Sequence, residues 1–296
     1  MRMKSVLIRF IVFIGLSVTW GSGAEAVDLQ LHPSGPYLED KTATQQPGQL
    51  PGSRAVSGGH DIALAWLADA TGRYRHGVLG DELEAATLAV VTATGRTLRY
   101  ELPEQRVLED LEPRIVDLDG DRRDEIIVVE SDLTSGASLA VYGLRDGRLE
   151  KLAATSFLGR PNRWLNPVGA GDFDDDGRMD LALVTTPHIG GVLQLYNYRK
   201  EQLELFAAYP GISTHRIGTT ALALGRVVAG QQRDRLLVPD QLRSTLLLLE
   251  FSPEGWLETS RVSLPGTLGS ALYPVAPDRW QFSLEDGRHF SVRLTD

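Results

Sequence analysis

Apolar residues in this chain form short blocks, or alternate with polar residues, and turn-forming residues bound each block. Ile126–Val129 and Leu181–Val184 are typical of these blocks. Such runs, when bounded by turn signals, predict β-strands. Beyond the N-terminal segment we find no stretch with the spacing of an amphipathic helix. The pattern therefore predicts an all-β protein.

Two copies of one pattern dominate the chain, at residues 114–129 and 168–184. Each copy places an acidic turn directly before an apolar strand. The acidic positions correspond one to one: Asp117, Asp119, Asp121 and Glu125 fall on Asp172, Asp174, Asp176 and Asp180. The strands that follow also correspond, Ser138–Leu144 with Val192–Tyr198 and Leu149–Thr155 with Leu203–Ala208. Each copy thus holds four short strands in about fifty residues, the size of a propeller blade.

Weaker copies flank these two. Four strands are predicted upstream, at Ile62–Asp69, His76–Leu79, Thr87–Thr92 and Thr97–Leu102. The next copy downstream has strands at Arg233–Val238, Thr245–Phe251 and Leu257–Val262, and Arg226, Val228 and Gly230 stand at its metal positions. The last copy has three strands, at Ala271–Val275, Trp280–Leu284 and His289–Leu294. We therefore expect no ion in the downstream copies.

These copies predict a β-propeller of about five four-stranded blades, with four or six blades as alternatives. The predicted blades span approximately residues 60–112, 113–165, 166–217, 218–266 and 267–296. A propeller ring closes best when the incomplete last blade takes a strand from the other end of the chain. Val27–Leu31, which alternates apolar and polar residues, is the candidate for that strand.

Residues 1–26 are typical of a cleaved secretory signal peptide. Basic residues precede or border an apolar core at Val6–Val18, and Ala24-Glu25-Ala26 offers small residues for cleavage. Retention of this segment as an anchor is the alternative. Residues 27–59 then comprise the N-terminal strand and a tether rich in Pro, Gly, Gln, Ser and Thr, which we interpret as flexible. The propeller domain is predicted to span residues 60–296.

Composition narrows the location and the partners. The chain has no cysteine and a net charge of −9, which becomes −11 when the signal segment is removed. An acidic protein is poorly suited to bind nucleic acid or anionic membrane surfaces. No second apolar stretch has the length of a membrane span, so we expect no stable membrane insertion after signal cleavage. We expect a periplasmic or secreted bacterial protein, exported through a Sec-type signal and stabilised without disulfides.

The stretch from Asp172 to Asp180 has acidic residues at its first, third, fifth and ninth positions and Gly177 at the sixth. A hard cation such as Ca²⁺ takes six to eight oxygen ligands, and such a turn supplies most of them. Without a cation these carboxylates repel one another. A strand follows the turn, so it is not an EF-hand. We expect one or two structural calcium ions; a solvated acidic turn is the alternative.

These two acidic turns, each entering an apolar strand within a fifty-residue unit, resemble FG-GAP or VCBS-type repeats. That family builds calcium-binding β-propellers, including the head of integrin α subunits and many secreted bacterial proteins. The resemblance implies that Asp172, Asp174, Asp176 and Asp180 bind calcium with the Arg178 carbonyl, and that Asp117, Asp119, Asp121 and Glu125 do so with the Arg123 carbonyl. The first loop departs from the family pattern at Arg122, where glycine is expected, and a left-handed backbone there is strained.

The turns opposite the acidic loops contain the remaining unusual residues. Successive turns of an antiparallel sheet lie at opposite ends of its strands, so we expect six of these residues to converge around one blade: Arg163, Trp164, Asn166, His188, His215 and Arg216. Arginine binds acidic groups and tryptophan stacks on sugars, so the hypothesis is a site for an anionic or sugar-like ligand. Ordinary packing between blades is the alternative. Asp240–Arg243 is a further candidate on this face.

Together these features predict a binding or scaffold protein at the cell envelope, with a protein or carbohydrate ligand. The alternative is an envelope enzyme that acts on an anionic saccharide or phosphoester through His188, His215 and Arg216. The sequence contains no nucleophile elbow, zinc-protease helix or phosphate-binding loop motif. We therefore assign no catalytic residue.

Overall fold

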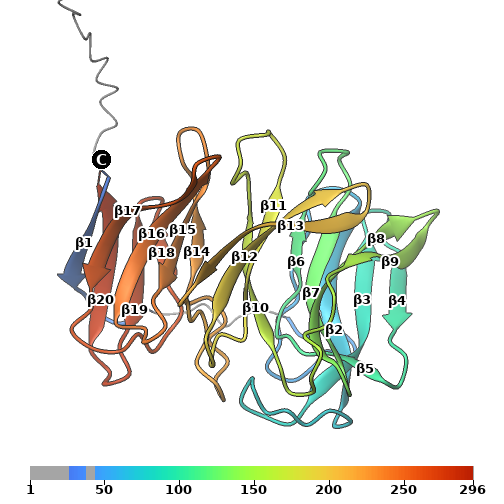
Figure 1. The fold of residues 1–296 in the computed structure, drawn as a ribbon. Helices are drawn as coiled ribbons and strands as arrows, with labels where there is room; N and C mark the ends of the chain where they lie inside the picture. Colours follow the sequence, from blue (N-terminus) through green and yellow to red (C-terminus); the bar gives the residue numbers. More distant parts are fainter. Residues whose placement is uncertain (1–26, 38–43, 296) are drawn as a thin grey trace, which may run out of the picture.

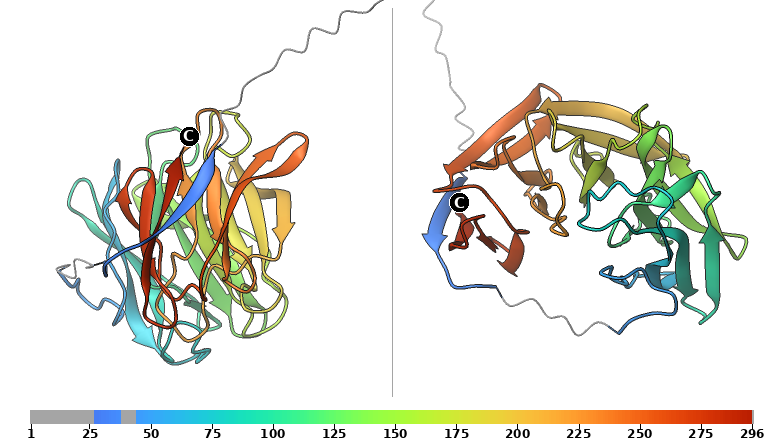
Figure 2. Two further views of the ribbon diagram at one scale, coloured as in Figure 1. Left: turned by 90° about the vertical axis from the view of Figure 1, so that its left-hand side faces the viewer. Right: turned by 90° about the horizontal axis from the view of Figure 1, so that it is seen from below.

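The computed structural model describes residues 27–37 and 44–295. All regular secondary structure in these residues is β, in twenty strands, and no helix occurs among them. Accordingly, these residues contain no helix long and apolar enough to cross a membrane. The strands form antiparallel sheets that follow one another around an arc, with the first and last sheets at its two ends (Figures 1 and 2). We group the strands into five units, numbered along the chain.

The first unit contains β2 (Ile62–Thr71), β3 (Glu84–Thr92) and β4 (Thr97–Glu101). Residues 49–56 lie along β2 through two isolated bridges, Gln49 to Ala68 and Val56 to Ala65. The sequence predicts a flexible tether over this part of the chain, whereas Leu50 is buried and donates its amide hydrogen to Leu67 at 2.8 Å. Its isolated apolar residues among Pro, Gly and Ser give no periodic signal, which is why the pattern missed the pairing.

The predicted strand at His76–Leu79 is absent, and residues 72–83 instead connect β2 and β3 as a loop. Arg75, Gly77 and Gly80 have φ values of +51°, +69° and +104° there. These values lie in the left-handed region, which a strand does not use. The loop places the His76 side chain against the second unit, where it has a role described below.

The second unit contains β6 (Arg114–Val116), β7 (Glu125–Asp132), β8 (Gly136–Arg145) and β9 (Arg148–Ala154). The short β5 (Arg106–Leu108) pairs with both β3 and β7 and joins the first two units into one eight-stranded sheet. The second strand, β7, is buried on both faces along most of its length. This explains why its sequence is a continuous apolar block rather than an alternating one.

The third and fourth units are four-stranded meanders. The third contains β10 (Leu165–Gly171), β11 (Asp180–Thr185), β12 (Val192–Arg199) and β13 (Gln202–Pro210). The fourth contains β14 (Arg226–Val228), β15 (Arg235–Pro239), β16 (Thr245–Ser252) and β17 (Gly255–Ser263). In both units the first strand lies innermost and the last strand outermost on the arc (Figure 2).

The fifth unit contains β18 (Tyr273–Ala276), β19 (Arg279–Ser283) and β20 (His289–Thr295). Its outer strand is β1 (Asp28–Pro33), which pairs antiparallel with β20 from Asp28 opposite Thr295 to Pro33 opposite Phe290. The strand expected from the N-terminal end thus completes the last sheet. Leu29 is buried in the core that the fifth unit shares with the fourth.

Most of the core lies between neighbouring units rather than in one central body. The four largest clusters of buried apolar side chains each connect two consecutive units. Tyr142, Tyr198, Phe173 and Phe282 are the bulkiest fully buried side chains in these clusters. Each sheet therefore has both faces covered, except where it ends the arc, and the units stabilise one another in sequence order.

Candidate functional site

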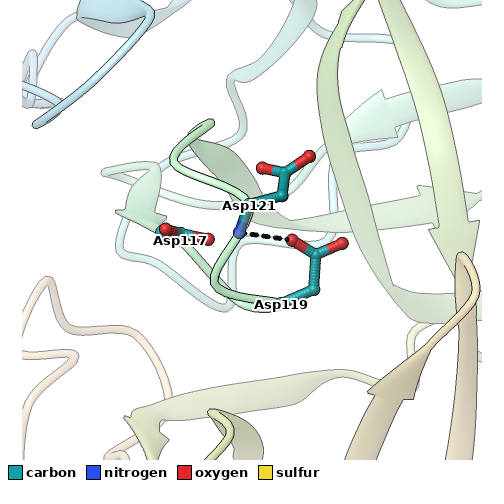
Figure 3. Close-up of side chains that lie close together, drawn as sticks. All are labelled: Asp117, Asp119 and Asp121. Carbon is teal, nitrogen blue, oxygen red and sulfur yellow. Dashed lines mark hydrogen bonds between the residues drawn. The ribbon is translucent and has the colours of Figure 1, made fainter.

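The two acidic turns join the innermost strand of a unit to its second strand. The first loop, Asp117–Glu125, joins β6 to β7, and the second loop, Asp172–Asp180, joins β10 to β11. In each loop the aspartates at the first, third and fifth positions bring carboxylate oxygens within 4.8 Å of one another: Asp117, Asp119 and Asp121 in the first loop, and Asp172, Asp174 and Asp176 in the second. Figure 3 shows Asp117, Asp119 and Asp121 projecting from a single turn of backbone in the first loop.

The first aspartate of each loop organises the turn by accepting backbone hydrogens. Asp117 accepts from the amides of Gly120 at 2.8 Å and Arg122 at 2.9 Å. Asp172 likewise accepts from the amides of Asp175 at 2.8 Å and Gly177 at 2.9 Å. Arg123 and Arg178, the expected carbonyl ligands, come next and donate their amide hydrogens to Asp121 at 2.8 Å and Asp176 at 3.0 Å.

Both loops require a left-handed backbone at two positions, the fourth and the sixth. In the first loop these are Gly120 (φ +76°) and Arg122 (φ +66°), and in the second they are Asp175 (φ +66°) and Gly177 (φ +80°). Each loop thus uses glycine at one of the two positions and a strained residue at the other. The second loop thus also has one left-handed residue other than glycine, Asp175, a residue type that adopts this conformation more readily than arginine does.

The acidic residue at the ninth position of each loop, Glu125 or Asp180, is the most buried of the expected ligands. Glu125 and Asp180 are 0% exposed, and each accepts a backbone hydrogen from its own loop, from Leu118 at 2.9 Å and Phe173 at 3.3 Å. The pKa of each carboxyl group is raised to about 7, mainly by burial and in smaller part by the nearby aspartates. Glu125 Oε1 is buried with no hydrogen-bond partner among the described residues. A hard cation among these oxygens satisfies that atom and removes the repulsion, so the residues fit calcium.

The fourth unit has no acidic loop between β14 and β15. Its equivalent residues differ from Arg226, Val228 and Gly230, which the comparison of the repeats predicted. The β14–β15 register places Val228 opposite Arg235, as Gly171 stands opposite Asp180. Ala229 therefore takes the place of Asp172, and Arg235 that of Asp180, in a loop two residues shorter. Arg235 is buried and points toward the Ala229 carbonyl, at 3.5 Å. In this unit a guanidinium therefore stands at the position that the Asp180 carboxylate occupies in the third unit.

Across the third unit from its acidic loop, three rings meet. Trp164 precedes β10 and His188 follows β11, at the ends of these strands opposite Asp172 and Asp180. The His188 ring stacks on Trp164 with a centroid separation of 6.0 Å, and the His215 ring lies 4.7 Å from Trp164. We call Trp164, His188 and His215 the ring cluster.

Hydrogen bonds fix the protonation pattern of the two histidines. His215 Nε2 lies 2.9 Å from the Thr219 carbonyl, which only accepts, so this nitrogen carries the hydrogen. His215 Nδ1 then accepts from His188 Nε2, at 2.8 Å. Burial lowers the pKa of His188 to about 4 and that of His215 to about 3, with smaller effects from other residues, Arg243 among them. Both rings are neutral near pH 7.

The other three residues predicted to bind a ligand on this face, Arg163, Asn166 and Arg216, do not all join the ring cluster. Asn166 is buried and donates to the backbone carbonyls of Thr214 at 3.0 Å and Leu222 at 2.7 Å, which holds the third unit to the fourth. Arg163 is half-buried beside Trp164. Arg216 is exposed and points to Glu285, at 3.6 Å. Trp164 is only 2% exposed and donates to the Glu109 carbonyl at 3.0 Å, so its ring face is not presented to solvent.

The Asp240–Arg243 turn adjoins the same face. Gln241 accepts from the Gly191 amide at 2.7 Å and donates to the Pro187 carbonyl at 3.0 Å, which fixes the loop that bears His188. Arg243 pairs with Glu285 at 2.9 Å. This turn therefore binds other loops of the same chain.

Sequence patterns missed several residues that the structure places at these sites. His76 Nδ1 lies 2.5 Å from Glu109, a buried carboxyl group whose pKa is raised by burial. Arg199 and Asn197 contact the second acidic loop from β12. His76 was hidden by its assignment to a strand. Finding Arg199 and Asn197 requires the β11–β12 register, which no local pattern specifies.

Comparison with known proteins adds one match. Residues 117–183 match the family model of the FG-GAP-like repeat. The matched segment includes both acidic turns, Asp117–Glu125 and Asp172–Asp180, and the strands between them. No curated protein matches the chain. The segment is therefore an FG-GAP-type repeat, as its acidic spacing indicated.

Proposed function

We propose that this chain, which contains an FG-GAP-type repeat, is an exported, calcium-stabilised β-propeller that binds a protein partner at the cell envelope. In this proposal the five units are the blades. The use of β1 as the outer strand of the last unit supports it, because that exchange joins the two ends of the chain in a single blade. The location rests on the signal-like sequence of residues 1–26.

The proposed calcium ions have a structural role. The residues that would hold them are the four acidic side chains of each loop with the carbonyls of Arg123 and Arg178. A bound ion supplies positive charge that neutralises the clustered carboxylates and ties the innermost strand of a unit to its second strand. The ligand set is hard and has no histidine, which supports a structural site rather than one that activates water.

A continuous surface opposite the acidic loops is the observation that carries the binding role. Hydrogen bonds join its loops: Gly218 donates to the Val78 carbonyl and Asn162 to the Tyr74 hydroxyl, both at 2.8 Å. The three most exposed large hydrophobic side chains of the described residues belong to this surface: Ile189 at 65%, Ile217 at 60% and Leu242 at 74%. We call these three residues the aliphatic triad.

The triad favours a protein partner over a carbohydrate. Exposed aliphatic groups gathered on one face are typical of protein interfaces, where their burial drives association. A sugar site instead needs an open aromatic ring, and His188 covers Trp164. Arg216 and the partly buried Arg163 border the surface and supply hydrogen-bond donors for acidic groups of the partner.

The alternative of an enzyme that uses His188, His215 and Arg216 has less support. Both ring nitrogens of His215 are engaged, one with His188 and one with the Thr219 carbonyl. His215 is also 1% exposed. Proton transfer to a substrate would require breaking one of these bonds in a buried site.

The test compares two variants that remove exposed apolar side chains from different parts of the protein. One replaces the triad (Ile189→Asp, Ile217→Asp, Leu242→Asp). The control replaces Leu205 and Leu257, which are 50% and 56% exposed on the outer strands β13 and β17. Each protein is cross-linked in intact envelopes of a host strain, and its cross-linked partners are identified. We expect the wild type and the control to share a partner that the triad variant loses. If both variants keep the partner, or if both lose it, the proposed surface is contradicted.

A further inference from the structure

The two acidic loops differ in the residues that face them from the third strand of their units. In the third unit, Asn197 stands opposite Asp180. In the second unit, the pairing of Ile126 with Tyr142 places Gly143 opposite Glu125. By the same register, Arg145 and Arg199 occupy equivalent positions, two residues further along their strands. The third strand of each unit thus faces its acidic loop at equivalent positions, but the side chains at these positions differ between the two units.

In the second loop the third strand supplies both a hydrogen-bond donor and a positive charge. Asn197 Nδ2 donates to Asp180 Oδ1 at 2.7 Å and to Asp174 Oδ2 at 3.3 Å. The Arg199 guanidinium donates to Asp176 and lies 3.7 Å from Asp180 Oδ1. Two of the aspartates expected to bind an ion are therefore already paired with a cation of the chain itself.

In the first loop neither partner is present. Gly143 has no side chain, which leaves Glu125 Oε1 without a hydrogen bond. Arg145, the equivalent of Arg199, bonds Glu201 Oε1 at 3.0 Å instead of a loop carboxylate, although its charge still acts to lower the pKa of Glu125. The remaining cationic or titratable neighbours are exposed and lie at the edge of ion-pair distance: His60 is 3.8 Å from Asp117, and Arg123 is 4.0 Å from Asp121.

One turn of the chain creates this difference. Lys200 and Glu201 form the tight turn between β12 and β13, with φ values of +51° and +58°. Arg199 on one side of the turn contacts the second loop, while Glu201 on the other side pairs with Arg145 of the second unit. The third unit therefore supplies a cation to its own loop and an anionic partner to the equivalent arginine of the second unit.

We propose that Arg199 is a built-in competitor for calcium, so that the first loop binds the ion more tightly and the second fills only when the guanidinium is displaced. This inference rests on the proposed calcium binding. An ion that enters the second loop must break the contact between Arg199 and Asp176 and then tolerate a positive charge nearby. An ion that enters the first loop meets four carboxylates and satisfies the buried Glu125 oxygen.

This proposed order of calcium affinities, with the first loop tighter than the second, is the reverse of what the glycine pattern suggests. Gly177 at the sixth position makes the second loop the better match to the family pattern, whereas Arg122 stands there in the first. Each loop has glycine at one of its two left-handed positions, so the number of glycines does not separate the two loops. The charges supplied by neighbouring strands distinguish the two loops, because affinity for calcium depends strongly on the net charge of the ligand set.

Calorimetric calcium titration of five proteins tests this inference: the wild type, Asp119→Asn, Asp174→Asn, Arg199→Gln and Arg145→Gln. The first two substitutions each disable one loop and identify it. Arg145→Gln is the matched control, since it removes an equivalent arginine whose hydrogen bond is to Glu201 rather than to a loop carboxylate. Circular dichroism establishes that each variant is folded.

We expect two classes of site in the wild type, with Asp119→Asn removing the tighter one and Asp174→Asn the weaker one. Arg199→Gln should tighten the weaker site by on the order of tenfold, because it removes a positive charge beside the ion. Arg145→Gln should change neither site by more than about twofold. Loss of the tighter site in Asp174→Asn, or no gain in Arg199→Gln, would overturn the inference while leaving calcium binding intact. No binding in any protein would refute the proposed calcium sites themselves.

Discussion

The Asp124 carboxylate accepts the amide hydrogen of His60 at 2.7 Å, although the two residues lie 64 positions apart and in different units. The amides of Gly59 and Ile62 donate to the same carboxylate, at 3.2 and 3.1 Å. Asp234 repeats this arrangement in the fourth unit, where it accepts from the Asp172 amide at 3.0 Å. An aspartate just before the second strand of a unit thus ties that unit to the turn of the preceding one.

The first prediction concerns this tie. Asp124 is 2% exposed, and Asp124→Ala leaves three amides without their acceptor. We expect a loss of about 2–4 kcal/mol in the free energy of unfolding, since hydrogen bonds to a buried charged group are among the stronger ones. Urea denaturation measures the loss. Glu104→Ala, at an exposed position, is the control and should change stability by less than about 0.5 kcal/mol. A similar small change for Asp124→Ala would show that the tie does not stabilise the fold.

The second prediction concerns the left-handed residues of the acidic loops. Gly177→Ala should destabilise the protein by about 1 kcal/mol, because a Cβ at φ +80° is strained. Gly35 is the matched control: its φ is outside the left-handed range and nothing lies within 4 Å of an added Cβ. Gly35→Ala should be neutral or slightly stabilising. Thermal denaturation in the presence of a chelator isolates the backbone effect from that of calcium. Equal melting temperatures for the two variants would contradict this assignment.

The third prediction concerns the strand contributed by the N-terminal end. Leu29 of β1 is 4% exposed and packs in the core between the fourth and fifth units. Leu29→Ala should cost about 2–4 kcal/mol, as other truncations of buried leucine do. The neighbouring Gln30 points outward and serves as the control. If both substitutions leave the urea midpoint unchanged, β1 is not part of the folded domain in solution.

The fourth prediction concerns pH. Burial lowers the pKa of His215 to about 3, well below its ordinary value of 6.5. Between these values the unfolded chain binds a proton that the folded one does not, so this residue makes stability fall as the pH falls below about 6.5. The slope contributed by one such group is at most about 1.4 kcal/mol per pH unit.

His215→Gln should therefore flatten the dependence of stability on pH between about pH 4 and 6.5. Buried carboxyl groups such as Glu84, whose pKa is raised to about 7 by burial, act in the opposite sense in the same window. These carboxyl groups are present in both the wild type and His215→Gln, so the difference between the two curves of stability against pH isolates the contribution of His215. Urea denaturation at several pH values provides the curves, and parallel curves would contradict the lowered pKa of His215.

Much of the strand order follows from the sequence, because the acidic turns and apolar blocks repeat. The alignment of Glu125 with Asp180 was correct, and it located the second strands of two units. The N-terminal strand was also placed correctly, since a unit with three strands leaves one edge to fill. These inferences rest on local patterns repeated at a fixed spacing, which a single sequence contains.

The remaining features depend on contacts between distant residues. Leu50 pairs with Leu67 in a stretch whose composition is typical of a linker. Trp164 was expected to lie either in a ligand site or between blades, and its contact with the Glu109 carbonyl cannot be inferred from the residues around it. The difference between Arg145 and Arg199 is of the same kind, because the sequence gives both as an arginine that ends a strand. Their partners are decided by the side chains that the fold brings within reach.

Calcium dependence of thermal stability tests the central claim most directly. The measurement is the melting temperature of the wild type in chelator and at increasing free calcium, with an Asp119→Asn, Asp174→Asn double variant as the control. We expect the wild-type melting temperature to rise steadily with the logarithm of calcium concentration once the concentration exceeds the dissociation constant, and the control to respond weakly. Identical wild-type melting curves in chelator and in calcium would contradict the claim that these loops bind a stabilising ion.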